Sequence, residues 1–177
     1  SVLTVSDARG KIARVPSLPS VVVVGGGAMG ASIACELAER GHGVTVLEQF
    51  SAGHARGSSH GSSRIVRLTY DDPFYVRLAL EARPLWDELK LLTTEPVFHE
   101  CGSVDHGPRE QLDPFAAALD EAGVAYEWLA PDEASKRWPG LRFDQAVLFQ
   151  ADGGVANPDN ALHLIRHRAQ QAGAQWL

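Results

Sequence analysis

Residues 21–30 of this chain read VVVVGGGAMG, and this stretch decides the fold. Four valines predict a β-strand, and apolar residues recur at helical spacing along the run Ala31–Arg40 that follows. The pattern G-x-G-x-x-G falls on Gly25, Gly27 and Gly30. The first glycine allows a tight turn, the second lets the backbone approach a pyrophosphate, and the third lets the helix pack closely on the sheet. The N–H groups and the dipole of the helix N-terminus would then face the phosphates.

An acidic residue stands where such a βαβ unit needs one. The β-rich run Val44–Leu47 ends in Glu48, about 20 residues past the glycines, at the position that binds the adenosine ribose hydroxyls. Gln49 comes next, and no arginine stands where a 2′-phosphate would require one. The motif therefore predicts FAD or NAD as the ligand and disfavours NADP. The alternative is a βαβ unit whose glycines serve packing alone.

Composition disfavours several other classes of protein. The 177 residues carry a net charge of −6 and a pI near 5.6, which argues against a nucleic-acid partner. No apolar run approaches the length of a membrane span, so we expect no membrane partner. The two cysteines imply no disulfide framework, which fits a cytoplasmic location. Residues 1–20 lack the apolar middle of a signal peptide and are expected to form a flexible extension.

The rest of the chain alternates predicted strands and helices. Pro84 falls inside the first expected helix after the βαβ unit and predicts a kink or a break there. Asn157 is the expected N-cap of the last helix, and Gly41 and Gly173 are expected to close two helices at their C-terminal ends. The expected strands cover 64–70, 96–107, 124–129, 146–150 and 174–177, and the expected helices cover 73–92, 111–122, 131–138 and 158–172.

Two segments after Glu48 permit more than one interpretation. Residues 51–63 are rich in serine and glycine, so they form either a surface loop or a loop that wraps the cofactor. Arg64 and Arg67 lie in a β-rich run, where residues three apart point to opposite faces. If both arginines serve one site, the run must be a helical turn or a distorted strand. The alternative is a pair of solvated surface charges.

The stretch GSSHGSSRIVR at residues 57–67 carries a more specific resemblance. Together with the glycine motif, Glu48 and residues 75–86, it resembles the monomeric sarcosine oxidase and N-methyltryptophan oxidase group of the D-amino-acid-oxidase-like FAD oxidoreductases. The runs RWPGL at 137–141 and ADGGVANP at 151–158 look like the same family. The resemblance covers roughly residues 20–177.

The resemblance implies an oxidase that acts on secondary or N-methylated amino acids. A hydride would pass from the amine-bearing carbon to flavin N5, and O₂ would reoxidise the flavin and give H₂O₂. The implied partners are a small amine or amino-acid substrate, O₂ and the remainder of the protein's own chain. Family members are longer and carry a flavin-linked cysteine and lysines in a C-terminal half that this sequence does not contain. We therefore expect residues 1–177 alone to be inactive.

The resemblance also assigns roles by position. Gly25, Gly27, Gly30 and Glu48 would hold the ADP half of FAD, and the set of cofactor-binding residues is completed by Ala28, Met29, Gln49, Gly57, Ser58 and Arg64. The predicted catalytic residues are His60, Arg64 and Arg67. The planar guanidinium of Arg67 would bind the substrate carboxylate through two parallel hydrogen bonds. Arg64 would stabilise the reduced flavin, and His60 would orient the substrate or tune its amine, which must lose a proton before the hydride leaves.

The predicted fold class is α/β, a Rossmann-like FAD-binding βαβ unit with an inserted α+β portion of a substrate domain. Residues 21–70 would form the βαβ unit and cofactor loop, 71–150 part of the substrate domain, and 151–177 the return to the FAD-binding domain. The last strand, from residue 174, would be the third parallel strand of the nucleotide-binding sheet. Because it is so short, we expect the protein to be truncated here.

Two rival functions use the same glycines and Glu48. An NAD-dependent dehydrogenase would leave the serine-rich loop and the arginine pair unexplained. A non-catalytic FAD-binding subunit would retain the cofactor without the chemistry. His163 and His167 have the spacing of a helical metal site, but no acidic or cysteine partner accompanies them, so we predict a solvated helix face and no metal.

Overall fold

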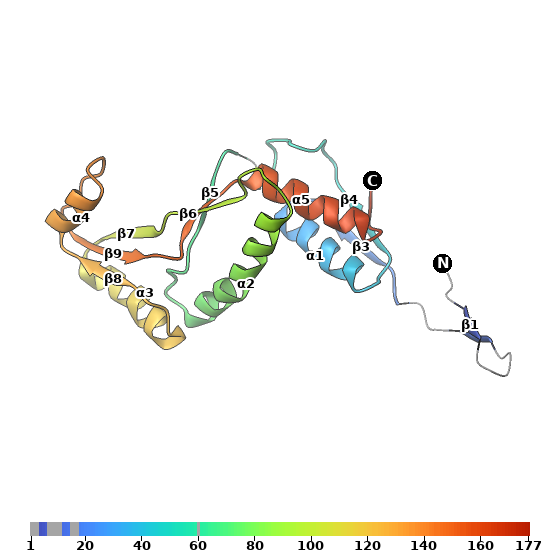
Figure 1. The fold of residues 1–177 in the computed structure, drawn as a ribbon, viewed down its shortest axis with the longest axis horizontal. Coiled ribbons are helices and arrows are strands. Elements are labelled where there is room, and N and C mark those ends of the chain that lie inside the picture. The colour runs from blue at the N-terminus through green and yellow to red at the C-terminus, as the bar shows by residue number, and fades with distance from the viewer. Residues whose placement is uncertain (1–3, 7–11, 15–17, 60) are drawn as a thin grey trace. The chain divides into compact units, whose positions relative to one another are not determined.

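The computed structural model describes residues 4–6, 12–14, 18–59 and 61–177 of the chain (Figure 1). The chain divides into two compact units. The first comprises residues 1–60 and 162–177, and the second comprises residues 61–161. His60 and most of the expected N-terminal extension lie outside the described residues. The described parts of that extension are residues 18–20, which lead into β3 (Val21–Val24), and two short strands, β1 (Thr4–Ser6) and β2 (Ile12–Arg14), which pair antiparallel.

The first unit contains the predicted parallel sheet. Strands β3 (Val21–Val24), β4 (Val44–Leu47) and β11 (Gln175–Trp176) lie in the order β11-β4-β3, and both pairings are parallel. Helix α1 (Ala28–Glu39) connects β3 to β4, and α5 (Pro158–Gln171) precedes β11. The prediction that residues 174–177 form the third strand is confirmed, because β11 pairs with β4.

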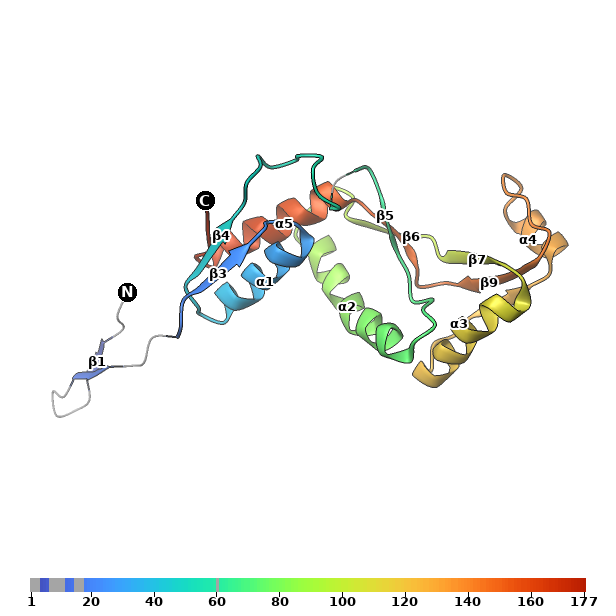
Figure 2. The same cartoon turned by 180° about the vertical axis from the view of Figure 1, so that it is seen from behind.

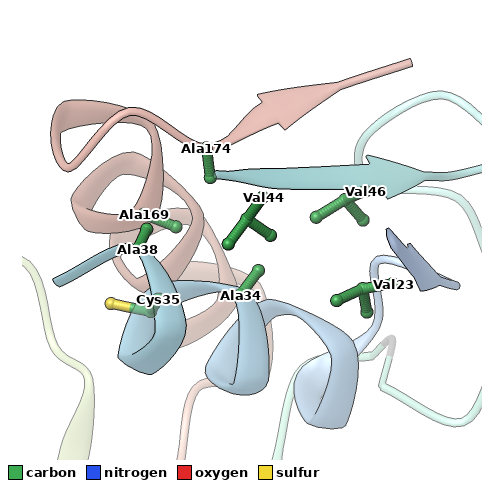
Figure 3. Packing of buried hydrophobic residues seen from close by; sticks show 8 residues of the cluster. All are labelled: Val23, Ala34, Cys35, Ala38, Val44, Val46, Ala169 and Ala174. Atoms are coloured by element: carbon green, nitrogen blue, oxygen red, sulfur yellow. The ribbon is translucent and has the colours of Figure 1, made fainter. Parts of the chain in front are cut away.

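Small side chains form the core of this unit. Val44 and Val46 of β4 are buried against Ala34 of α1 and Ala169 of α5, so both helices cover the same face of the sheet (Figure 3). The other members of the cluster are Val23, Cys35, Ala38 and Ala174. Alanines along the helices let them approach the strands closely, which a nucleotide-binding βαβ unit requires. Burial raises the pKa of the Cys35 thiol to about 11, so this side chain packs as a neutral group.

Glycines close both helices of the first unit, as expected. Gly41 has a φ of +86°, and its N–H donates to the carbonyl of Ala38 while that of His42 donates to Leu37. The same pair of bonds recurs after α5, where Gly173 has a φ of +102°. This arrangement is the Schellman motif, in which a left-handed residue satisfies the last carbonyls of the helix. At the other end of α5, the Asn157 side chain accepts from the N–H of Asn160 at 3.1 Å, which confirms the predicted N-cap.

The second unit contains two three-stranded antiparallel sheets. One has the order β5-β10-β6 and the other the order β7-β9-β8. Their strands are β5 (Arg64–Val66), β6 (Phe98–Glu100), β7 (Ser103–Gly107), β8 (Glu127–Leu129), β9 (Ala146–Gln150) and β10 (Gly154–Ala156). Helices α2 (Pro73–Leu91), α3 (Arg109–Ala122) and α4 (Pro131–Arg137) complete the unit (Figure 2). Its main core joins Leu68, Val76 of α2, Leu119 of α3 and Leu148 of β9.

The structure corrects three expectations about this unit. The single strand expected at 96–107 is two strands, because Gly102 turns the chain with a φ of +80°. Strand β10 was not predicted, since its residues are too few and too glycine-rich to show an alternating pattern. Of the two outcomes expected at Pro84, a kink or a break, the break is wrong, because α2 continues from Pro73 to Leu91 and is held by buried Val76 and Leu89. Among the described residues, no helix combines the length and apolarity that crossing a membrane requires.

Candidate cofactor site and substrate-binding residues

The last glycine of the motif, Gly30 in the first turn of α1, has no room for a side chain against the glycine turn between β3 and α1. Gly25 has a φ of +94°, and its N–H donates to the carbonyl of Leu47 at 2.8 Å. A Cβ atom on Gly30 would lie 1.8 Å from the carbonyl oxygen of Gly25, far inside van der Waals contact. Glycine at position 30 is therefore required for α1 to pack on the turn.

The N-terminus of α1 carries no side-chain cap of its own. Gly27 is the N-cap residue, and the first turn contains no acidic side chain. The N–H of Ala28 instead donates to the hydroxyl oxygen of Ser59 at 3.0 Å. The loop at 51–63 thus reaches the glycine turn, as one of its two interpretations anticipated. Ser59 was missing from the predicted set, because nothing in the sequence distinguishes it from the other serines of the loop.

Glu48 is fixed by backbone N–H groups at the carboxyl end of β4. Its Oε2 accepts from the N–H of Gly26 at 2.6 Å, and its Oε1 accepts from that of Phe50 at 2.9 Å. The bond from Gly26, followed by that from Phe50, holds the pKa of this carboxyl below its usual range. His54 lies beside it, with Nε2 at 3.6 Å from Oε1. Glu48 is therefore ionised and oriented at neutral pH.

These residues fit the ADP half of a dinucleotide. Each oxygen of Glu48 has lone-pair capacity beyond its one backbone bond, so it can accept from a ribose hydroxyl. A Cβ on Gly27 would lie 3.3 Å from the Ser59 hydroxyl, which shows how closely the loop approaches the turn. The helix end beside it, whose first turn contains no acidic side chain, favours a negative group such as a pyrophosphate.

The other predicted cofactor residues of the first unit lie in α1 or in the segment that follows β4. Ala28 and Met29 are in the first turn of α1, and Met29 is 78% exposed. Gln49, Gly57 and Ser58 are exposed and belong to the segment that follows β4. Their proposed contacts with FAD remain predictions.

The second unit holds the two predicted arginines. Arg64 opens β5, and its Nη1 donates to the carbonyl of Ser63 at 2.7 Å. Arg67 follows the strand, which ends at Val66, so the regular strand does not cover both arginines. Nη1 of Arg67 lies 3.7 Å from Oδ1 of Asp105, and its guanidinium carbon lies 5.2 Å from the centre of the Tyr70 ring. Asp105 was not predicted, because only the fold brings β7 beside residue 67.

The histidine pair on α5 is exposed. The rings of His163 and His167 are stacked with their centres 6.4 Å apart, and Gln171 lies 3.0 Å from Nε2 of His167. Within the described part of the chain, no group of three or more His, Cys, Asp or Glu residues could hold a metal ion.

The parallel sheet, the glycine turn and the acid after β4 define a dinucleotide-binding βαβ protein. The family model described as FAD dependent oxidoreductase matches residues 20–177, and the chain belongs to this family. The predicted family, fold class, cofactor and enzyme class are thereby confirmed.

Named relatives agree with this assignment. Monomeric sarcosine oxidase from Bacillus sp. (strain B-0618) is 32% identical over 163 residues, which cover 89% of this chain and 42% of that enzyme. The structure is similar to the Tyr-to-Phe variant of NikD, an amino acid oxidase of nikkomycin biosynthesis, with a TM-score of 0.73 and 35% identity over 89% of this chain and 42% of NikD. It is also similar to L-proline dehydrogenase from P. horikoshii, with a TM-score of 0.77 and 27% identity over 92% of this chain and 44% of that protein. The chain thus spans less than half the length of these relatives.

Proposed function

We propose that the full-length protein to which this chain belongs is an FAD-dependent oxidase of secondary or N-methylated amino acids. The observation that carries the proposal is Arg67, a cation just past β5 whose side chain is 42% exposed. Among the described residues, no acceptor receives a hydrogen bond from the N–H groups of its guanidinium. A planar guanidinium whose N–H groups are available can bind a substrate carboxylate through two parallel hydrogen bonds. The likeness to sarcosine oxidase supports the same substrate class.

The chemistry divides between the cofactor and the chain. When bound, FAD would supply the redox chemistry: it would accept the hydride of the amine-bearing carbon, leaving an imine for hydrolysis, and O₂ would take up the two electrons with two protons to give H₂O₂. Glu48 and the glycine turn hold the ADP half. Arg67 binds the carboxylate and thereby orients the carbon that loses its hydride. Arg64 would supply positive charge to the flavin, and His60 would orient the substrate or tune its amine.

The substrate assignment is tested by H₂O₂ release from the full-length protein. We expect oxidation of sarcosine, other N-methyl amino acids and cyclic amino acids such as proline. Dimethylamine, which is sarcosine without its carboxylate, serves as the matched control and should be oxidised far more slowly. A protein that binds flavin but oxidises none of these amines would favour the alternative of a non-catalytic FAD-binding subunit. A colourless protein that binds NAD would contradict the proposal altogether.

The same assay applies to residues 1–177 alone. They cover 42% of the Bacillus sarcosine oxidase, so the relatives use many residues that lie beyond the matched region. We expect no H₂O₂ from this piece under conditions in which the full-length protein is active.

A further inference from the structure

We propose that Asp105 is a positioning residue that holds the Arg67 guanidinium ready for the substrate carboxylate. This inference rests on the proposed function, because it concerns how that carboxylate is bound. Asp105 lies in a different sheet of the same unit from β5, which precedes Arg67, and would act on the substrate through Arg67.

The positive charge of Arg67 compensates the negative charge of the Asp105 carboxylate. Asp105 lies on β7 opposite Leu148 of β9, and Leu148 is fully buried in the main core of the unit. Cross-strand partners point to the same face of a sheet, so Asp105 faces the core that also contains Leu68. Its Oδ2 is buried and has no hydrogen-bond partner among the described residues. A carboxylate in such a place is costly unless a cation lies nearby, and Arg67 is the cation that the structure provides.

Arg67 is in turn held from two sides. Asp105 lies at 3.7 Å from Nη1, and the Tyr70 ring lies under the guanidinium at 5.2 Å. The backbone between Arg67 and Tyr70 is anchored by Leu68 and Thr69, which are 2% and 0% exposed. Tyr70 itself contacts the ring of Tyr75 on α2, with ring centres 5.9 Å apart.

The separation between the two charges leaves Arg67 available for a ligand. At 3.7 Å the pair attracts electrostatically, but the distance exceeds that of a hydrogen bond. With respect to the residues that the structure describes, the five N–H donors of the guanidinium therefore remain open to a second carboxylate. A side chain that is already oriented loses less conformational entropy when the ligand binds. Ordering one long side chain can change affinity by up to about tenfold.

The test measures equilibrium binding of propionate to the full-length, FAD-loaded protein by calorimetry, with propionamide as the uncharged control. We expect Asp105→Asn to weaken propionate binding about tenfold, the cost of ordering one side chain on binding, and to leave propionamide binding unchanged. Ser103→Ala is the matched variant, because Ser103 lies two residues away on the same face of β7 and also has a buried oxygen without a described partner. It should bind propionate as the unmodified protein does. Unchanged or tighter propionate binding by Asp105→Asn would overturn the inference.

Arg67→Ala separates this inference from the proposed function. If Arg67→Ala still binds propionate normally, the carboxylate site itself is wrong. If Arg67→Ala no longer binds propionate while Asp105→Asn binds it with unchanged affinity, the carboxylate site stands and only the positioning role of Asp105 is wrong.

Thermal unfolding supplies a readout that requires no ligand. Arg67→Ala removes the cation beside the Asp105 carboxylate, which is 18% exposed and has a buried Oδ2, so adding Asp105→Asn should raise the Tm above that of Arg67→Ala. The inference fails if Asp105→Asn changes the Tm by the same amount in Arg67→Ala as in the unmodified protein, because the two residues are then not coupled.

Discussion

The Oε2 atom of Glu48 accepts a 2.6 Å hydrogen bond from the backbone N–H of Gly26, which joins the end of β4 to the glycine turn that begins α1. The two parts of the dinucleotide motif are thus one structure. The acid that would bind the ribose also fixes the turn that would receive the pyrophosphate. Phe50 supports the same carboxylate from the other side, at 2.9 Å from Oε1.

Glu48→Ala should weaken FAD binding by the full-length protein. A hydrogen bond to a charged group contributes about 1.5–3 kcal/mol, so we expect the Kd to rise between about tenfold and 150-fold. Quenching of flavin fluorescence during titration measures the affinity. Glu36→Ala is the control, because Glu36 is exposed on α1 and its ion pair among the described residues is with Arg40 of the same helix. Equal affinities for the two variants would remove Glu48 from the cofactor site.

The lowered pKa of Glu48 predicts a pH dependence of stability. The ordinary value is 4.5 and the folded value is lower, chiefly because of the bond from Gly26. The contribution of Glu48 to stability is therefore complete above about pH 4.5 and is lost as the pH falls through the folded pKa. Denaturant unfolding from pH 6 to pH 3 should show the stability gap between the unmodified protein and Glu48→Gln closing with acidification. A gap that widens in acid would contradict the assigned shift.

Gly30→Ala should strongly destabilise the first unit. The added Cβ would overlap the carbonyl oxygen of Gly25 at 1.8 Å, so the strand and α1 would have to separate. We expect a loss above about 3 kcal/mol, or failure to fold, by thermal unfolding. Gly140→Ala is the matched control, because no heavy atom lies within 4 Å of the Cβ that it would add. Its Tm should change by less than a few degrees.

Arg67→Ala should reduce kcat/KM for N-methyl amino acids and affect carboxylate-free amines much less. Removing one partner of a buried charge pair costs about 2–5 kcal/mol, which corresponds to roughly 30-fold to several thousandfold. The control is Arg77→Ala, since Arg77 on α2 is half exposed and pairs with Glu121 on the surface. In steady-state kinetics with sarcosine, kcat/KM of Arg77→Ala should stay within about twofold of that of the unmodified protein. A similar loss in both variants would point to general destabilisation.

Sequence patterns predicted the parts of the structure that local rules govern. The strand, glycine turn, helix and acid of residues 21–48 all lie where they were expected, because each has a distinct residue pattern. The caps at Gly41 and Asn157 were predictable for the same reason. Strand β10 was not, since three residues in a glycine-rich segment carry no periodic signal.

Two residues of the candidate sites, Asp105 and Ser59, depend on tertiary structure and escaped prediction. Arg67 could be picked out as a cation near a family motif, but Asp105 is 38 positions further on and reads as an ordinary strand residue. Ser59 is likewise one of several serines in its loop, and only the folded chain places its hydroxyl at the N–H of Ala28. Pairings between distant segments require the fold, which single-residue patterns do not specify.

The central claim, that this chain belongs to an amine-oxidising flavoprotein, is tested most directly by reducing the bound flavin with substrate. Sarcosine is added without O₂ to the full-length, FAD-loaded protein, and the visible absorption of the flavin is followed. The bands should bleach, and admitting O₂ should restore them with release of H₂O₂. Flavin bands that stay unchanged with every N-methyl and cyclic amino acid would contradict the account.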